Sequence, residues 1–546
     1  MSILIFLIIS YILLSISLYF LFPKAGEAGW KGLVPGLNFV VWAKVVGRNP
    51  WHAAWMLFPI VNFFIYAGLA IDMVRSFRHY TFWESLLSVI ATPFFFFYLA
   101  FNEKEKYDGP TLVKEREFRK QLQEAKANNN KKQLSKLEAS NPYKRTQLRE
   151  WAEAIIFAVF AAAFIRMFLI EAYVIPTSSM EDSLLVGDFL FVSKAHYGIR
   201  TPMTVVQVPL FHNRFGAGGG RGIMKLLKVI EGETYLEKPS LPYYRLPAIE
   251  SIDRNDLIVF NYPEGDSVYI FPDRTWSSHD YRRNSIPASY AQQIKTGRKK
   301  LVTRPMDKKD HYIKRCVAVG GDSIMIRDRQ LYVNGKPAKN PSKMEFMYSV
   351  EIPEGVTINT RNFANWGIST EDMLSANSNP MILILTDEQK AKIQGMDAGI
   401  NLTYLDMGRV SGGDKLFPHD PNRTEGWTVD NYGPIWVPKK GVTIDLTPEN
   451  IALYRRTIDV YEGNDFAERD GKFFINGKET NRYTFKMNYF WAMGDNRHNS
   501  EDSRVWGFVP EDHIVGKPLF IWFSLKEGQL SKGINWKRIF TSAAKK

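Results

Sequence analysis

Residues 175–180 of the 546-residue chain read Ile-Pro-Thr-Ser-Ser-Met, and they follow a long apolar run that ends near Ile170. A cluster of hydroxyl side chains just outside a predicted membrane span is compatible with a serine nucleophile. Most serines, however, are loop or cap residues. A serine hydroxyl also needs a base before it becomes a good nucleophile at neutral pH. The histidines that could serve show no triad pattern in the sequence; they are His196, His311, His498 and His513.

Three later segments combine charged residues with short apolar runs. Residues 253–263 read Asp-Arg-Asn-Asp-Leu-Ile-Val-Phe-Asn-Tyr-Pro, and residues 312–322 read Tyr-Ile-Lys-Arg-Cys-Val-Ala-Val-Gly-Gly-Asp. Residues 493–507 read Met-Gly-Asp-Asn-Arg-His-Asn-Ser-Glu-Asp-Ser-Arg-Val-Trp-Gly. With residues 175–180, these segments resemble the signature boxes of bacterial type I signal peptidases (leader peptidases), membrane-bound Ser/Lys proteases that remove signal peptides. The resemblance extends from about residue 152 to residue 523, with long unmatched insertions.

The resemblance implies that Ser179, which directly precedes Met180, is the nucleophile and that Lys314 is the general base. Family members often have Gly at the position of Ser178, so Ser178 is a rival nucleophile here. A lysine accepts a proton only when it is neutral, and burial among apolar groups lowers its pKa. The residues around Lys314 are apolar enough to supply that environment: Ile313, Cys316, Val317 and Val319. By itself, Lys314 is equally compatible with a surface lysine on a strand.

The resemblance also assigns supporting roles. The oxyanion of the scissile carbonyl would bind the Ser179 backbone N–H and the hydroxyl of Thr177, where many members have Ser. Ser500 matches a serine that orients the lysine amine. Asp502 and Arg504 match a pair that supports the site through a salt bridge.

Substrates of this family carry small residues one and three positions before the cut, which requires two shallow apolar pockets. An extended substrate is expected to pair with a strand edge near them. For Ile175 and Ile313, ordinary core packing is an equally good interpretation. The expected pocket residues are Ile175, Pro176, Met180, Tyr312 and Ile313.

The composition limits the possible partners. The net charge is +13, which favours anionic partners, and the long apolar runs favour lipid over nucleic acid. Cys316 is the single cysteine, so no intramolecular disulfide can form. With one cysteine and no His-Glu-x-x-His motif, no metal and no cofactor are expected.

Four apolar stretches are long enough to cross a bilayer: residues 3–22, 53–71, 82–101 and 154–170. The loop at 102–149 is rich in Lys and Arg, which indicates the cytoplasmic side. Four spans then place the amino terminus and the chain after Glu171 outside the cytoplasm. The expected location is the bacterial inner membrane, multi-pass, with the catalytic domain on the outer, periplasmic side. The loop at Arg75 and Arg78 also falls outside, in mild conflict with its charge.

After Glu171 the sequence changes to short β-rich runs, such as residues 189–192, 257–260 and 316–319, and residues 513–523 read as a final strand pair. The predicted fold is a multi-span α-helical membrane region followed by a mainly-β catalytic domain with signal-peptidase-like antiparallel sheets and a large inserted accessory subdomain. The predicted parts are a membrane region with about three spans (1–101), a basic loop (102–149), a transmembrane helix (150–172), the catalytic domain (173–336 and 471–525), the insertion (337–470) and a basic tail (526–546).

The sequence thus predicts a membrane-anchored serine endopeptidase that removes N-terminal signal peptides from exported preproteins. Its expected partners are preprotein signal peptides and membrane lipid, with proximity to the secretion translocon and without nucleic acid. A decayed, non-catalytic scaffold is a second hypothesis, which the presence of Ser179, Lys314 and Ser500 disfavours. A third hypothesis makes residues 1–101 a lipid- or partner-binding module fused to the peptidase, because a protease anchor does not need so many spans.

Overall fold

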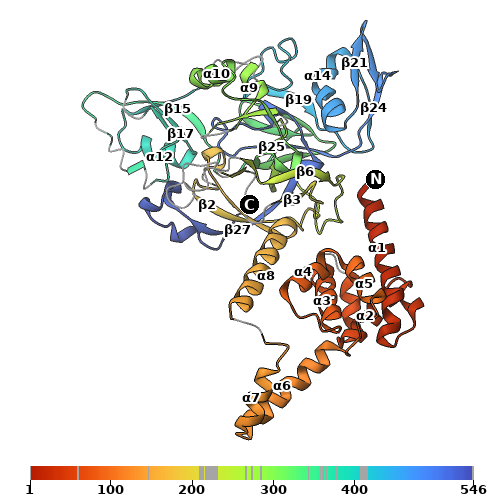
Figure 1. The fold of residues 1–546 in the computed structure, drawn as a ribbon. Coiled ribbons are helices and arrows are strands. Elements are labelled where there is room, and N and C mark those ends of the chain that lie inside the picture. Colours follow the sequence, from red (N-terminus) through yellow and green to blue (C-terminus); the bar gives the residue numbers. More distant parts are fainter. Residues whose placement is uncertain are drawn as a thin grey trace. The chain divides into compact units, whose positions relative to one another are not determined.

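The computed structural model describes residues 2–57, 61–144, 147–181, 183–207, 214–215, 232–264, 267–271, 275–282, 286–341, 343–356, 358, 362–363, 366–375, 378–405 and 416–543. The chain divides into two compact units, Met1–Ala158 and Val159–Lys546. The first unit is helical and the second is mainly β (Figure 1).

The amino-terminal unit is built around the buried indole of Trp42. Its ring meets Phe96 edge-on at 5.1 Å between centroids and stacks on Phe39, and its Nε1 donates to the Leu69 carbonyl at 3.0 Å, so the polar atom is satisfied. Residues from the first, second, third and fifth helices complete this core. The helices are α1 (Ser2–Leu21), α2 (Leu37–Val46), α3 (Val61–Arg75), α4 (Phe82–Ile90), α5 (Thr92–Phe101), α6 (Thr111–Ala127) and α7 (Lys131–Ala139).

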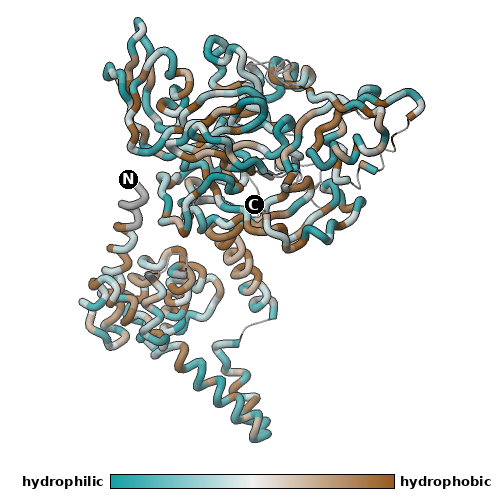
Figure 2. Tube along the Cα trace, turned by 180° about the vertical axis from the view of Figure 1, so that it is seen from behind, coloured by the Kyte–Doolittle hydropathy of each residue, from teal (hydrophilic) through white to brown (hydrophobic). Residues whose placement is uncertain are grey.

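Two helical segments among the described residues are long and apolar enough to cross a membrane. One is Ile8–Ala25, which comprises most of α1 and the 3₁₀ turn after it, and the other is Glu150–Phe168 of α8 (Gln147–Phe168). Hydrophobic residues dominate the second half of α8 (Figure 2). The predicted span at 82–101 is instead two helices, α4 and α5, bent by 112°. The predicted span at 53–71 falls on a 3₁₀ segment (Pro50–Leu57) and the 15-residue helix α3. The multi-span prediction is therefore confirmed only in part.

Polar contacts bring the ends of several helices in this unit together. Arg48, just after α2, pairs with Asp72 of α3 at 2.7 Å, and Arg78, after α3, pairs with Asp108, after α5, at 2.7 Å. The Asp108 N–H also donates to the Ser76 carbonyl at 2.8 Å. Lys24, after α1, donates to the Leu99 and Asn102 carbonyls at the end of α5, both at 2.7 Å. The segments following α1, α2, α3 and α5 therefore lie at one end of the unit.

Eight described strands of the second unit form one antiparallel sheet in the order β1-β2-β27-β7-β11-β25-β26, with β28 added to β27. The sheet begins at β1, only two residues after α8 ends. Residues 513–523, predicted as a strand pair, form one long strand after a single helical turn, which corrects that prediction. The strands are β1 (Ile170–Val174), β2 (Asp188–Ser193), β7 (Leu257–Asn261), β11 (His311–Val319), β25 (Tyr489–Met493), β26 (Val509–Pro510), β27 (Ile514–Ser524) and β28 (Thr541–Ser542).

Strand β11 lies inside this sheet, between β7 and β25. Its residues Lys314 and Arg315 are opposite Ile258 and Leu257 of β7, and both are buried. Successive side chains of a strand point to opposite faces. The strand therefore directs Lys314 and Arg315 to different sides of the sheet.

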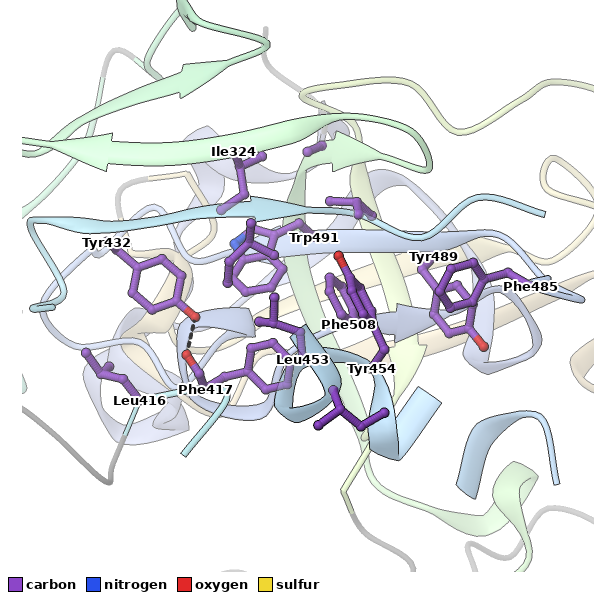
Figure 3. Close-up of a cluster of buried hydrophobic side chains, with 14 of the residues drawn as sticks. Ile324, Leu416, Phe417, Tyr432, Leu453, Tyr454, Phe485, Tyr489, Trp491 and Phe508 are labelled. Atoms are coloured by element: carbon purple, nitrogen blue, oxygen red, sulfur yellow. Dashed lines mark hydrogen bonds between the residues drawn. The ribbon is translucent and has the colours of Figure 1, made fainter. Parts of the chain in front are cut away.

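Two large apolar cores of the second unit contain residues of the predicted insertion. One contains Trp491, Phe508, Phe417 and Tyr454, and the Tyr432 hydroxyl donates to the Phe417 carbonyl at 2.7 Å (Figure 3). The other is formed only by residues 346–400 and their neighbours. The predicted insertion at 337–470 is thus divided: its first part has a core of its own, whereas residues 416–466 share a core with the catalytic segments.

The remaining strands form small antiparallel sheets. Three of them have two strands: β3 (Thr204–Gln207) with β6 (Tyr235–Ser240), β4 (Arg214–Phe215) with β5 (Gly232–Glu233), and β20 (Thr443–Asp445) with β24 (Arg482–Thr484). Two have three strands: β8 (Ser267–Ile270) with β9 (Thr275–Ser277) and β10 (Val302–Thr303), and β21 (Phe466–Arg469) with β22 (Lys472–Ile475) and β23 (Lys478–Glu479). Two have four strands: β12 (Ser323–Arg327) with β13 (Gln330–Val333), β14 (Lys336–Pro337) and β19 (Tyr432–Trp436), and β15 (Phe346–Glu351) with β16 (Met373–Ser375), β17 (Met381–Leu385) and β18 (Asn401–Tyr404). Besides the second half of α8, the helices among the described residues of this unit are α9 (Ser278–Arg282), α10 (Ala288–Lys295), α12 (Asp387–Gln394), α14 (Pro448–Arg456) and α15 (Ser503–Trp506).

Candidate active site

The serine loop, residues 175–180, leaves the sheet at the end of β1 and closes with a 3₁₀ turn, Ser178–Met180. Ile175 and Met180 are buried in one apolar cluster and anchor both ends of the loop. The backbone of Ile175 is also fixed, because its N–H donates to Asp188 and its carbonyl accepts from Gly187, both at 2.9 Å. Between these anchors, Pro176 and Thr177 are exposed and Ser179 is half-buried.

Lys314 Nζ lies 2.5 Å from Ser179 Oγ. The Lys314 side chain is 3% exposed, and its burial lowers the pKa of the amine from 10.5 to about 8. Negative charge on nearby carboxylates, Asp502 first, opposes this shift but does not outweigh the burial. A buried amine that is neutral in a useful fraction of molecules near pH 8 can accept a proton from the serine hydroxyl.

Ser178 faces different partners. Its Oγ accepts a hydrogen bond from Asn499 Nδ2 at 2.9 Å, and its backbone N–H donates to Glu371 Oε2 at 3.2 Å. The residue is almost fully buried. Of the two adjacent serines, the geometry therefore brings Ser179 and not Ser178 to the lysine amine.

Gly494 lets the loop at 494–500 approach the serine loop. A Cβ at this position would lie 2.2 Å from Ser500 Oγ and 2.5 Å from the Ser179 carbonyl oxygen. The Asn496 N–H donates to that same carbonyl at 3.4 Å. Ser500 Oγ is buried and has no hydrogen-bond partner among the described residues, so the expected bond from Ser500 to the Lys314 amine is not formed in this structure.

Asp502 and Arg504 form a fully buried ion pair with two parallel hydrogen bonds of 2.9 and 2.7 Å. Asp502 Oδ2 also accepts from the Gly494 N–H at 3.1 Å, and Arg504 donates to the Arg497 carbonyl at 2.7 Å. Burial acts to raise the pKa of Asp502, but the Arg504 charge and these hydrogen bonds hold it below its usual value. The pair therefore ties both ends of the segment 494–504 together.

A second buried pair lies on the other face of β11, and no sequence motif had assigned it. Arg315 donates to Asp495 through two hydrogen bonds of 2.8 and 2.6 Å, and the same carboxylate accepts from Ser183 Oγ at 2.6 Å. Both residues stand in the segments quoted above, 312–322 and 493–507, and this was the available signal. This pair connects strand β11, the 494–504 segment and the chain that follows the serine loop.

The expected pocket residues differ in exposure. Ile175 and Met180 are buried, Ile313 is half-buried against the same cluster, and Pro176 is exposed. Tyr312 stacks on Tyr262 with centroids 4.7 Å apart. These contacts are those of packed side chains, and a role in substrate binding stays a prediction.

Two of the histidines considered as bases, His498 and His513, bond to partners other than the serines. His498 Nδ1 accepts from the Met347 N–H at 3.1 Å, and its Nε2 donates to Asp430 Oδ1 at 3.0 Å. His513 pairs with Asp512. Across the described chain, no hydrogen bond joins a histidine to either serine.

A serine hydroxyl within hydrogen-bonding distance of a buried lysine amine is an arrangement suited to serine hydrolases that use lysine as the base. The model of the signal peptidase family, peptidase S26, matches residues 148–379 and 441–523 of the chain. The chain therefore belongs to this family, as a type I signal peptidase, and it is a serine peptidase.

Curated relatives agree with this assignment. "Signal peptidase I" of Haemophilus influenzae is 26% identical over 71% of this chain and 74% of its own length. Proteins with the same name from Buchnera aphidicola and Helicobacter pylori are each 22% identical, over 73% and 72% of this chain and 84% and 90% of theirs. Residues 30–110 match a separate family of unknown function, DUF5684.

Proposed function

We propose that the protein removes N-terminal signal peptides from exported preproteins, with Ser179 as the nucleophile and neutral Lys314 as the general base. The observation that carries this proposal is the 2.5 Å approach of the buried Lys314 amine to Ser179 Oγ. The names of the relatives supply the substrate class.

The proposed reaction has two halves. Lys314 Nζ takes the hydroxyl proton as Ser179 Oγ attacks the scissile carbonyl, and the Ser179 N–H and the Thr177 hydroxyl stabilise the oxyanion. The C–N bond then breaks, the Lys314 ammonium protonates the leaving amine, and an ester to Ser179 remains. In the second half, Lys314 takes a proton from water as the water attacks the ester. Collapse of that intermediate returns the proton to Ser179 Oγ and releases the signal peptide as a carboxylate.

Strand β1 supports extended binding of the substrate. It is an edge strand of the large sheet, pairs only with β2 among the described strands, and leads directly into the serine loop. An extended preprotein segment adding to this edge would bring its carbonyl to Ser179. In this proposal, Ile175, Pro176, Met180, Tyr312 and Ile313 shape the site for small side chains one and three residues before the cut.

The second unit also has features that suit a membrane surface. The sheet face opposite Leu190 and Val192 carries clustered aromatic rings: Phe189, Phe191, Phe520, Trp522 and Phe540. Aromatic side chains are enriched at the membrane–water boundary, and helix α8 enters this sheet directly through β1. Anchoring enzyme and substrate in one membrane raises their effective concentration. We propose membrane lipid as a partner on these grounds, whereas proximity to the secretion translocon follows only from the proposed function.

For the topology we propose two spans, α1 and α8, in the bacterial inner membrane. The Arg78–Asp108 ion pair and the Ser76–Asp108 backbone bond place the loop after α3 beside the start of the basic segment 102–149. Helices α4 and α5 would then enter and leave the bilayer on the cytoplasmic side. This arrangement keeps the catalytic unit outside and removes the charge conflict at Arg75 and Arg78.

The most direct test incubates the purified protein with a preprotein and sequences the new amino terminus of the product. We expect one cut, after a small residue, that is absent with Lys314→Ala. A preprotein left intact by the wild-type protein would contradict the proposed function. A second function for residues 30–110 is favoured by their separate family match and separate core; cleavage that is unchanged after deletion of residues 1–101 would support it.

A further inference from the structure

The four-stranded sheet of β15–β18, together with α12, lies within residues 344–405, and we call it the inserted sheet. It has an apolar core of its own. Two consecutive acidic residues of the inserted sheet, Glu371 and Asp372, nevertheless reach the catalytic loops.

Glu371 and Asp372 contact two different loops. Glu371 Oε2 accepts from the backbone N–H of Ser178, the residue before the nucleophile. Asp372 Oδ1 accepts from Asn496 Nδ2 at 3.1 Å, and the Asn496 N–H in turn donates to the Ser179 carbonyl. The two acids thus join the serine loop to the loop at 494–500.

The Asp372–Asn496 contact is fully buried, since both residues are 0% exposed. The Ser369 hydroxyl donates to the second carboxylate oxygen of Asp372 at 2.6 Å, which fixes the orientation of the carboxylate. A buried amide that loses its acceptor is destabilising, so the Asn496 side chain is held where Asp372 places it.

Strand β15 of the inserted sheet and the residue before it also bond to the loop at 494–500. Glu345, just before it, exchanges backbone hydrogen bonds with Asp495 and Arg497, at 3.2 and 3.0 Å. The Met347 N–H donates to His498 Nδ1. The loop that carries Ser500 is therefore bound to the inserted sheet along residues 495–498.

We propose that Glu371 and Asp372 are positioning residues of the peptidase: they set the spacing between the serine loop and the loop at 494–500, and so align Ser179 with Lys314 and Ser500. This inference rests on the proposed function, and it gives the inserted sheet a part in the reaction. Asp372 acts through its hydrogen bond to Asn496. Glu371 is exposed, so it contributes less to the spacing of the two loops.

The test compares four variants of the full-length protein. Asp372→Ala and Asn496→Ala each remove the bond, Asp372→Asn keeps an acceptor for Asn496 without the charge, and Glu388→Ala is a control on the exposed face of α12. Two rates are measured: cleavage of a preprotein, separated into kcat and KM, and acylation of Ser179 by p-nitrophenyl acetate. Thermal unfolding is followed for every variant.

We expect Asp372→Ala and Asn496→Ala to lower kcat and the acylation rate at least tenfold with KM changed less than twofold. Asp372→Asn should recover to within threefold of wild type, and Glu388→Ala should match wild type. Wild-type rates in Asp372→Ala, or an equal loss in Asp372→Asn and Asp372→Ala, would overturn the inference. If wild type is acylated but leaves the preprotein intact, the proposed function alone fails, and the acylation rates still decide the role of Asp372.

Discussion

Lys314 Nζ and Ser179 Oγ lie 2.5 Å apart, although 135 residues separate them in the chain. The lysine comes from an interior strand of the large sheet, and the serine comes from the loop that follows the edge strand β1. Burial on the strand lowers the pKa of the amine, and the serine loop brings the hydroxyl to it. Two separate structural elements thus supply the amine and the hydroxyl between which we propose the proton transfer.

The pH dependence of cleavage should follow Lys314. Because its pKa is lowered to about 8, the amine is neutral in roughly a tenth of the molecules at pH 7, and the active fraction rises about tenfold per pH unit below the pKa. We expect kcat/KM for a substrate without ionisable groups near the cut to rise from pH 6 to 8 and to level off above. A rate that stays flat over this range would exclude a titrating lysine base.

The same burial should make Lys314 unfavourable for stability. Its pKa is about 8 when folded and 10.5 when exposed, so between these values the unfolded chain binds more protons and the free energy of unfolding rises with pH. At pH 7, where both states are charged, Lys314→Met should therefore stabilise the protein by up to about 3 kcal/mol. The gain should shrink as the pH approaches 10.5. Thermal midpoints at pH 7 and 10 test this, with the exposed Lys336→Met as a matched control; a lower midpoint for Lys314→Met at pH 7 would contradict it.

Gly494→Ala should damage catalysis more than folding. The new methyl group would lie 2.2 Å from Ser500 Oγ and 2.5 Å from the Ser179 carbonyl, so one of the two loops must shift. A displacement of about 1 Å in an active site can lower the rate about 100-fold, while overpacking costs about 1–3 kcal/mol of stability. Cleavage rates and thermal midpoints measured beside Gly395→Ala, whose Cβ would meet its nearest atom at 3.3 Å, provide the comparison. Full activity in Gly494→Ala would show that the close approach is unimportant.

The two-span topology predicts which side of the membrane each loop occupies. Cys316 is fully buried and leaves a low labelling background, so single cysteines can be introduced at exposed sites. In spheroplasts, an impermeant maleimide should label Lys336→Cys but neither Arg78→Cys nor Lys104→Cys. The Arg78 side chain is 73% exposed, so protection there would come from the membrane. Labelling of Arg78→Cys from outside would restore the four-span arrangement.

The sequence predicted the parts of the fold that depend on local pattern. Alternating and continuous apolar runs predicted β2, β7 and β11, because strand periodicity is visible in a few residues. The break between α4 and α5 was missed, although Pro93 in the first turn of α5 is a typical helix-start signal. Apolar composition alone does not distinguish one straight span from two bent helices.

The candidate site, too, could be predicted from the sequence only in part. Its motif residues could be named from a resemblance, but their geometry depends on contacts between distant segments. Asp372 has no local signal, because its partner Asn496 is 124 residues away and the bond exists only after both segments fold. The resemblance already favoured Ser179 over Ser178, because Ser179 directly precedes Met180. The bond from Asn499 to the Ser178 hydroxyl, which supports that choice, could not be predicted, because it joins residues 321 positions apart.

The identity of the nucleophile is the central claim, and preprotein cleavage by Ser179→Ala and Ser178→Ala, measured beside wild type, tests it most directly. We predict no cleavage by Ser179→Ala, and cleavage within about tenfold of wild type by Ser178→Ala, because the Ser178 hydroxyl bonds Asn499 and not Lys314. Cleavage by Ser179→Ala together with an inactive Ser178→Ala would contradict the account.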